Sequence, residues 1–330
     1  MQKILSISIA AYNAEKFINQ CLDSFTENSS IIDKLDIMVI DDGGTDKTKD
    51  ITYEYIKKYP ESIRFIHKEN QGPGSTVNVG IKNAKAKYFR MVDGDDWVNS
   101  EAMPSYISYL ENHDVDMICT HFCCVDDKTG EQKNQVMNAV KYNEIVSFDS
   151  VANKLNLEMH NTTFKTDKVK DIVLDNGFYT DVEYLLLPTD KIQTFVALDL
   201  IIYMYRTSLD TQSMNINSLQ KNIKMHEDVL STLLNNYKVM LNKNISSEKI
   251  DYFENRIVKL IGTQLMIYLS YGNSSIYKDK TKNLFGNIKE QYPSLYKKVL
   301  GLKTVKVLEN TNYVLYGLVA NIKRKQLNAK

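Results

Sequence analysis

The fold is decided by the stretch Val92-Asp93-Gly94-Asp95-Asp96-Trp97, because it joins an apolar segment to a cluster of carboxylates. Residues 88–92 before this cluster are typical of a buried strand, as are residues 4–10 and 36–40. Segments with apolar residues at helical spacing follow each of these runs. Alternating strands and helices predict an α/β fold with a mostly parallel sheet covered on both faces. In such a sheet, ligands bind beyond the carboxyl ends of the strands.

The charge balance limits the classes of partner. The chain has 330 residues, with 41 Lys and Arg against 41 Asp and Glu, so its formal net charge is zero. We expect no nucleic-acid partner, because a phosphate backbone selects a basic surface. No apolar run reaches the ~18–20 residues that span a bilayer, and the N-terminus lacks the apolar core of a signal peptide. A cytoplasmic protein, or one peripheral to the inner face of the plasma membrane, is expected.

The sequence pattern changes twice along the chain. Strands and helices alternate to about residue 112, and residues 113–215 show short strands, turns and helical pieces. From residue 216 onward the apolar residues recur at helical spacing in long stripes. We therefore predict one domain over residues 1–215, built from two halves, and an α-helical C-terminal domain over residues 216–330.

Carboxylates gather where the predicted sheet would hold a ligand. Asp41 and Asp42 end the second strand, and Asp93, Asp95 and Asp96 end the fourth. Crowded carboxylates repel one another by several kcal/mol unless a cation or hydrogen-bond donors neutralise them. The Asp-x-Asp pair offers the hard oxygen ligands that Mg²⁺ or Mn²⁺ prefers. The alternative is that residues 93–96 form only a turn and a helix N-cap.

The ordered set of motifs resembles that of the family 2 glycosyltransferases, which have the GT-A fold. The motifs that carry the resemblance are Ser6-Ile7-Ser8-Ile9-Ala10-Ala11-Tyr12-Asn13, Cys21-Leu22-Asp23-Ser24, Ile40-Asp41-Asp42-Gly43, Asn70-Gln71-Gly72-Pro73 and Val92-Asp93-Gly94-Asp95-Asp96-Trp97. Each is common alone, whereas the series is specific. The resemblance implies a GT-A nucleotide-sugar-binding domain over 1–215, with a nucleotide-binding half at 1–112 and an acceptor half at 113–215.

The same resemblance assigns the donor site. It implies that the base is held by Ala11, Tyr12 and the second-strand aspartates, Asp41 and above all Asp42. It further implies Asp93 near the ribose and Asp95 on the Mn²⁺ or Mg²⁺ that bridges the diphosphate. Asn78 belongs to the same set, although Val77 stands where the family commonly has Arg, and Gly44 where it has Ser.

Two residues near the end of the first domain complete the predicted donor site. Arg206 follows a Tyr-x-Tyr segment and Ser213 comes shortly after, which resembles the family's diphosphate-binding segment. A guanidinium group can clamp pyrophosphate oxygens. The alternative for Arg206 is an ion pair with an aspartate at the domain junction.

A catalytic base is expected in the second half of the domain. The segment Phe178-Tyr179-Thr180-Asp181 resembles the family's Glu-Asp motif, with Thr180 in place of the glutamate. The resemblance implies that Asp181 deprotonates the acceptor hydroxyl, a role for which a carboxylate is suited. Asp181 as a mere helix N-cap is the alternative, and Glu183 is the rival base.

These expectations predict an inverting, metal-dependent glycosyltransferase. It would move a sugar from a nucleotide diphospho-sugar, UDP-linked, to a hydroxyl of a bacterial surface glycan or lipid-linked acceptor. The alternatives are a sugar-phosphate nucleotidyltransferase and a non-catalytic nucleotide-sugar-binding scaffold. The apolar tail over 313–325 has a basic end and allows two interpretations. Such a stripe more often packs on the helices or makes a homo-oligomer contact through the helical domain, and the alternative is peripheral contact with an anionic membrane.

Overall fold

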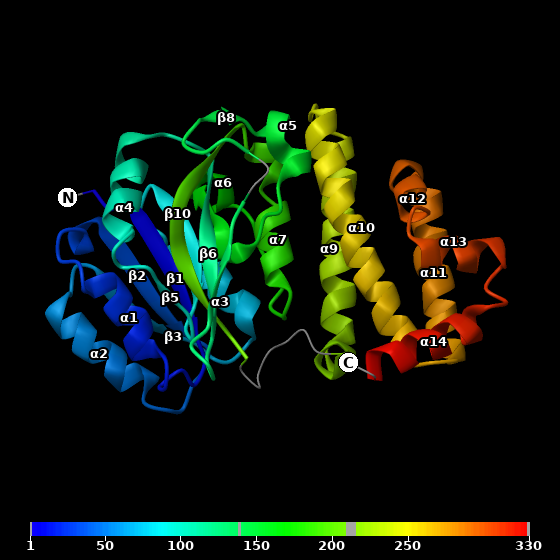
Figure 1. The fold of residues 1–330 in the computed structure, drawn as a ribbon, viewed down its shortest axis with the longest axis horizontal. Coiled ribbons are helices and arrows are strands. Elements are labelled where there is room, and N and C mark those ends of the chain that lie inside the picture. The colour runs from blue at the N-terminus through cyan, green and yellow to red at the C-terminus, as the bar shows by residue number, and fades with distance from the viewer. Residues whose placement is uncertain (1, 138–139, 209–215, 329–330) are drawn as a thin grey trace. The chain divides into compact units, whose positions relative to one another are not determined.

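The chain folds into two compact units, residues 1–211 and 212–330 (Figure 1). This computed structural model describes residues 2–137, 140–208 and 216–328. The first part of unit one alternates strand and helix in the order β1 (Leu5–Ala11), α1 (Ile18–Thr26), β2 (Leu35–Asp41), α2 (Thr48–Lys58), β3 (Ile63–His67), α3 (Pro73–Asn83) and β4 (Tyr88–Asp93).

The rest of unit one is less regular. Its strands are β5 (Trp97–Val98), β6 (Met117–Asp126), β7 (Gln132–Gln135), β8 (Val146–Ser147), β9 (Thr162–Lys165) and β10 (Thr194–Thr207). Its α-helices are α4 (Met103–Asn112), α5 (Phe148–Val151), α6 (Thr166–Val169) and α7 (Thr180–Leu186).

All the strands join one sheet with the main order β3-β2-β1-β4-β9-β6-β10-β5. The first four of these strands are mutually parallel. The second half adds β6 parallel to β10, while β9 pairs antiparallel with both β4 and β6. The predicted α/β fold is confirmed, and its parallel core is extended by strands of both directions.

The central strands are apolar because they are covered on both faces. In β1, Ile7 and Ile9 have no exposed surface, and β2 is buried along its whole length. Parallel strands between two helical layers have this continuous apolar character. Right-handed crossovers put α1 and α2 on one face of the sheet, and the reversal of strand order after β3 puts α3 on the other.

Unit two contains helices only in its described residues, 216–328. They are α8 (Ile216–Lys221), α9 (Ile223–Leu241), α10 (Ser247–Ser270), α11 (Ser275–Gln291), α12 (Pro293–Val299), α13 (Lys303–Asn310) and α14 (Tyr316–Asn328). The long α10 packs against α9, α11, α12 and α14. The predicted helical C-terminal region is thus confirmed.

Candidate active site

The candidate site lies where the strand order of the sheet reverses direction. The order β3-β2-β1-β4 makes β1 and β4 the switch point, and ligands of open α/β sheets bind beyond the carboxyl ends of such strands. The register pairs Ala10 of β1 with Asp93 of β4, and Ala11 of β1 with Asp41 of β2. The sheet itself therefore brings the predicted residues at three strand ends together.

Asp41 shapes the turn after β2. Its carboxylate is 2% exposed; it accepts a hydrogen bond from the Gly44 amide at 3.0 Å and lies 2.7 Å from Nδ1 of His67. Ala11 beside it is also buried, whereas the Tyr12 ring is 57% exposed. Of these predicted donor-site residues, Tyr12 thus has the side chain most accessible to a ligand.

Asp42 organises the loop before α3. Its Oδ1 and Oδ2 accept hydrogen bonds from the backbone amides of Gln71 (3.0 Å) and Gly72 (2.9 Å), and it forms an ion pair with Lys68. The side chain is 6% exposed. These contacts fix the Asn70-Gln71-Gly72-Pro73 motif against the end of β2.

Hydrogen bonds from β10 hold the turn after β4 in place. Tyr203 of β10 accepts a hydrogen bond from the Asp93 amide at 3.1 Å and donates one to Oδ2 of Asp96 at 2.6 Å. The Arg206 amide donates to Oδ1 of Asp96 at 2.7 Å. A Cβ at Gly94 would lie 2.8 Å from the carbonyl oxygen of Ala10, so the turn requires glycine there. Asp96 therefore supports the turn in which Asp93 and Asp95 stand.

The carboxyl groups of this turn are harder to ionise than usual. Burial, reinforced by the charge of Asp95 and weakly by that of Asp181, raises the pKa of Asp93 to about 6, against the opposing effect of His160. Burial raises the pKa of Asp95 as well, and burial with the charges of its two neighbours raises that of Asp96 strongly. A cation would relieve this repulsion.

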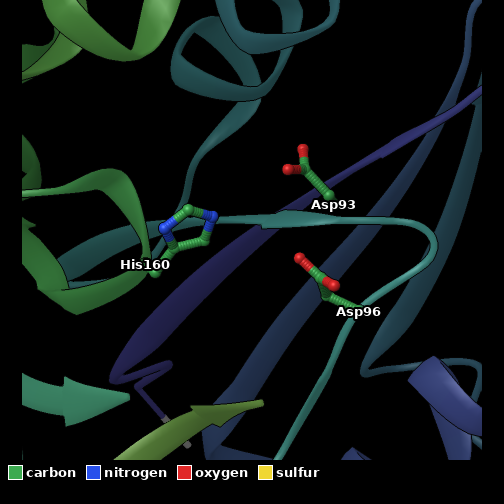
Figure 2. A group of neighbouring side chains, drawn as sticks. All are labelled: Asp93, Asp96 and His160. Atoms are coloured by element: carbon green, nitrogen blue, oxygen red, sulfur yellow. The ribbon is translucent and has the colours of Figure 1, made fainter. Parts of the chain in front are cut away.

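Three of the side chains form a set that can hold a metal ion. Asp93, Asp96 and His160 are neighbouring side chains (Figure 2). Each offers one ligand atom, and these atoms all lie within 4.8 Å of one another. Two carboxylates and one imidazole are donors that Mn²⁺ accepts, and each carboxylate oxygen of Asp96 keeps a free lone pair beside its hydrogen bond. The residues thus fit a divalent ion. Asp95, the predicted metal ligand, lies in the same turn but outside this set, and its role stays a prediction.

Sequence reasoning missed His160. It lies in a short 3₁₀ turn, Met159–Asn161, directly before β9. Its ring packs against three aromatic rings, those of Tyr205 (4.2 Å between centroids), Tyr203 (5.0 Å) and Phe122 (5.3 Å). No local motif marks this histidine, because it meets Asp93 only in the folded chain, where β9 pairs with β4 and the Arg90 side chain of β4 bonds the His160 carbonyl oxygen.

The two candidate bases lie at the start of α7 and differ in their burial. Asp181 is exposed, and its charge acts on the pKa of Asp93 across the site. Glu183 has no exposed surface, and its Oε2 accepts a hydrogen bond from the Asp175 amide at 2.9 Å. Burial and the nearby Asp175 carboxylate raise the pKa of Glu183 to about 8. This geometry favours Asp181 over Glu183 as a group that receives an acceptor's proton.

Asn78 connects α3 to the segment before α7. Its side-chain amide donates to the Leu174 carbonyl at 2.8 Å and accepts from the Leu174 amide at 2.9 Å. The following segment passes so close to α3 that a Cβ at Gly72 (φ 95°) would meet the Asn176 carbonyl oxygen at 2.3 Å, and one at Gly74 would clash with Asp175. Asn78, predicted in the donor site, thus pins the loop that leads to Asp181.

Arg206 packs against two aromatic rings, with its guanidinium carbon 4.8 Å from the ring centres of both Phe17 and Trp97. Its nitrogens donate to the Asp95 carbonyl (2.7 Å), the Asp127 carboxylate and Oε1 of Gln20 (2.6 Å). This arrangement gives Arg206 the aspartate pairing weighed as the alternative and makes it a support of the Asp95 backbone. Ser213, predicted beside it, lies outside the described residues.

Comparison with known proteins defines the class. The sequence profile of Glycosyl transferase family 2 matches residues 6–172, and the chain belongs to this family. The match covers β1 to β4, the Asp93–Trp97 turn and His160, which are the elements that build the candidate site.

Two curated relatives match part of the chain. The minor teichoic acid biosynthesis protein GgaB of Bacillus subtilis is 24% identical over 174 residues, which are 52% of this chain and 19% of that protein. The poly(ribitol-phosphate) beta-N-acetylglucosaminyltransferase TarS of Staphylococcus aureus is 28% identical over 113 residues, 34% of this chain and 20% of that protein. The chain thus spans about a fifth of the length of these two relatives.

A solved structure extends the likeness to the whole chain. The crystal structure of S. aureus TarS 1-349 in complex with UDP-GlcNAc matches with a TM-score of 0.65 and 18% identity, covering 99% of this chain and 89% of that one. At this identity the match shows the fold. Within the described residues, no helix is both long and apolar enough to cross a membrane.

Proposed function

We propose that the chain is an inverting, metal-dependent glycosyltransferase that moves a sugar from a UDP-linked donor to a hydroxyl of a bacterial surface glycan or lipid-linked acceptor. The observation that carries the proposal is the convergence of Asp93, Asp96 and His160 at the β1–β4 switch point, within the field of Asp181. The family assignment supports glycosyl transfer rather than nucleotidyl transfer, and the named relatives support a cell-wall polymer as acceptor.

The donor would bind across the ends of β1, β2 and β4. The exposed Tyr12 ring offers a face for the base, next to the turns that Asp41 and Asp42 hold rigid. An Mn²⁺ or Mg²⁺ ion on Asp95 and the Asp93–Asp96–His160 set would neutralise the charge of the leaving diphosphate. Tyr203 keeps the turn in place, so these carboxylates need little rearrangement when the donor binds.

The acceptor hydroxyl would approach from the side of α7. Asp181 would take its proton while the hydroxyl oxygen attacks the anomeric carbon and the bond to the diphosphate breaks. A single displacement of this kind inverts the anomeric configuration. General-base assistance contributes about 10²–10⁴-fold to such a step.

The first test is a thermal-shift panel of UDP, GDP, CDP, TDP and ADP, each with Mn²⁺, Mg²⁺ or EDTA. A nucleotide at ~100 times its Kd should stabilise the protein by about 2.7 kcal/mol. We expect a shift with UDP that needs the metal. A shift with another nucleotide alone would overturn the UDP assignment. No shift with any nucleotide would overturn the donor site, and binding without sugar transfer would favour the non-catalytic scaffold.

We also propose that α14 brings the protein to the inner face of the plasma membrane. Leu318 and Ile322 of α14 are one helical turn apart and 59% and 50% exposed, Val314 in the turn before α14 is 78% exposed, and Lys323 and Arg324 follow Ile322. Apolar side chains beside cations match an anionic lipid surface. Co-sedimentation with phosphatidylglycerol vesicles, but not with phosphatidylcholine vesicles, is expected and should weaken in Leu318→Gln. The membrane proposal would be overturned if the wild-type protein bound no vesicles but self-associated through the helical unit, and Leu318→Gln abolished that self-association.

A further inference from the structure

A cavity of about 430 Å³ lies wholly within the helical unit. It is lined by α9 and α11, both of which pack against α10 (Figure 1), and by one tyrosine of α10 itself. This size is within the range of pockets that hold small organic ligands. None of its residues takes part in the donor site described above.

The floor of the cavity is apolar and buried. Leu230 of α9 and Ile288 of α11 are at most 3% exposed, and the tyrosines 268 and 292 are at most 6% exposed. Such side chains offer aliphatic and aromatic surface, and a buried tyrosine adds a polar tip to an apolar body.

The rim of the cavity is polar, and its residues follow a regular spacing. They lie four positions apart on each helix, so they form one stripe on α9 and one on α11. The stripes are Ser231 and Asn235 on α9, and Asn283, Asn287 and Gln291 on α11. All five are exposed, and in the described part of the chain none of these side chains has a hydrogen-bond partner within the protein.

The charged groups at the end of the cavity neutralise each other. Glu227 lies 2.7 Å from the ammonium group of Lys280 and accepts a hydrogen bond from the Tyr268 hydroxyl at 2.9 Å. No other charged residue is among those that line the cavity. A phosphate or nucleotide therefore finds no uncompensated cation here, and a neutral ligand is favoured.

We propose that this cavity binds a neutral carbohydrate chain, at a site separate from the donor site. Each amide of the rim offers both hydrogen-bond donors and an acceptor, and a sugar hydroxyl likewise does both. The apolar C–H faces of sugar rings match the leucine, isoleucine and tyrosine floor. A glycosyltransferase that holds a distant part of its growing glycan would gain effective concentration at the reacting end.

The test measures binding of neutral oligosaccharides to the full chain by isothermal titration and by saturation-transfer NMR. The probes are tetra- and hexasaccharides of glucose and of N-acetylglucosamine, with poly(glycerol phosphate) as an anionic comparison. The variant Asn283→Ala/Asn287→Ala removes two rim amides without touching the buried floor. Glu290→Ala is the matched control, because Glu290 is an exposed residue of α11 that does not line the cavity.

We expect at least one neutral oligosaccharide to bind, with affinity about tenfold weaker in the double variant and unchanged in Glu290→Ala. No binding by any neutral probe, equal binding by the double variant, or preference for poly(glycerol phosphate) would each overturn the proposal. The UDP thermal shift, measured on the same samples, reports separately on the donor site. If oligosaccharide binds as expected but UDP gives no thermal shift, the proposed function is refuted and this inference stands.

Discussion

Removing the charge of Asp181 should slow sugar transfer, whereas removing that of Glu183, at the start of the same helix α7, should not. Glu183 is fully buried, and its carboxyl group meets both the amide and the side chain of Asp175. In Glu183→Gln the amide can still accept from the Asp175 amide and donate to the Asp175 carboxylate. We therefore expect this variant to fold and to transfer sugar at close to the wild-type rate. Asp181→Asn should bind donor normally but transfer ~10²–10⁴ times more slowly.

The size of the effect on the free energy of unfolding follows from the pKa of Glu183, which burial raises from 4.5 to about 8. Between these two values the folded protein keeps a proton that the unfolded chain releases. The free energy of unfolding must therefore fall as the pH rises through this window. The full slope is about 1.4 kcal/mol for each pH unit, and it is only half as steep at pH 4.5, where the unfolded-state carboxyl is half ionised. The loss between pH 4.5 and pH 7 is therefore about 3 kcal/mol. Glu183→Gln should remove this contribution to the slope.

The assay is chemical denaturation at several pH values between 5 and 8, followed by tryptophan fluorescence. The chain has one tryptophan, Trp97, which lies in the same unit as Glu183, so its signal reports on that unit. Asp181→Asn is the matched control and should change the slope only slightly, because the Asp181 charge is the smallest of the causes that raise the pKa values of Glu183 and Asp93. Equal slopes in wild type and Glu183→Gln would refute the burial argument. Loss of transfer in Glu183→Gln with retained folding would make Glu183 the base.

Three further outcomes are expected. Asp95→Ala should abolish metal-dependent UDP binding in the thermal-shift panel; an unchanged Mn²⁺ requirement and affinity would exclude it as the metal ligand. Gly74→Ala should destabilise the protein by several kcal/mol in denaturant, because its Cβ would lie 1.8 Å from the Asp175 carbonyl oxygen; wild-type stability would show that the loop moves freely. Tyr203→Phe should cost about 1–3 kcal/mol and lower transfer, since Asp96 loses its buried donor; an unchanged midpoint would contradict this.

The sequence was sufficient for the parallel core and for its ligand-binding edge. Apolar runs with turns after them locate β1, β2 and β4, because strands covered on both faces must be apolar throughout. The register then follows from parallel pairing, which places Asp41 and Asp93 on either side of β1. These patterns involve residues that are neighbours in the sequence, so they can be recognised without the structure.

Some roles within the site depend on contacts that no local pattern contains. Arg206 and Asp42 are predicted to contact the donor, which stays a prediction; the structure adds that Arg206 bonds the Asp95 carbonyl and that Asp42 accepts from the Gly72 amide. Asn78 likewise bonds the backbone at Leu174, almost a hundred residues away in sequence. The type of a residue determines which hydrogen bonds its side chain can form, whereas the packing of the folded chain determines with which partners it forms them.

The sequence by itself thus determined the family, the α/β fold, the helical C-terminal region and the carboxylates at the strand ends. The tertiary structure alone decided that His160 joins Asp93 and Asp96, through the antiparallel pairing of β9 with β4. It also decided that Glu183 is buried while Asp181 faces solvent, although both lie in the same short helix. The physical reason is that burial and proximity across long sequence separations arise from the packing of whole elements, which single residues do not encode.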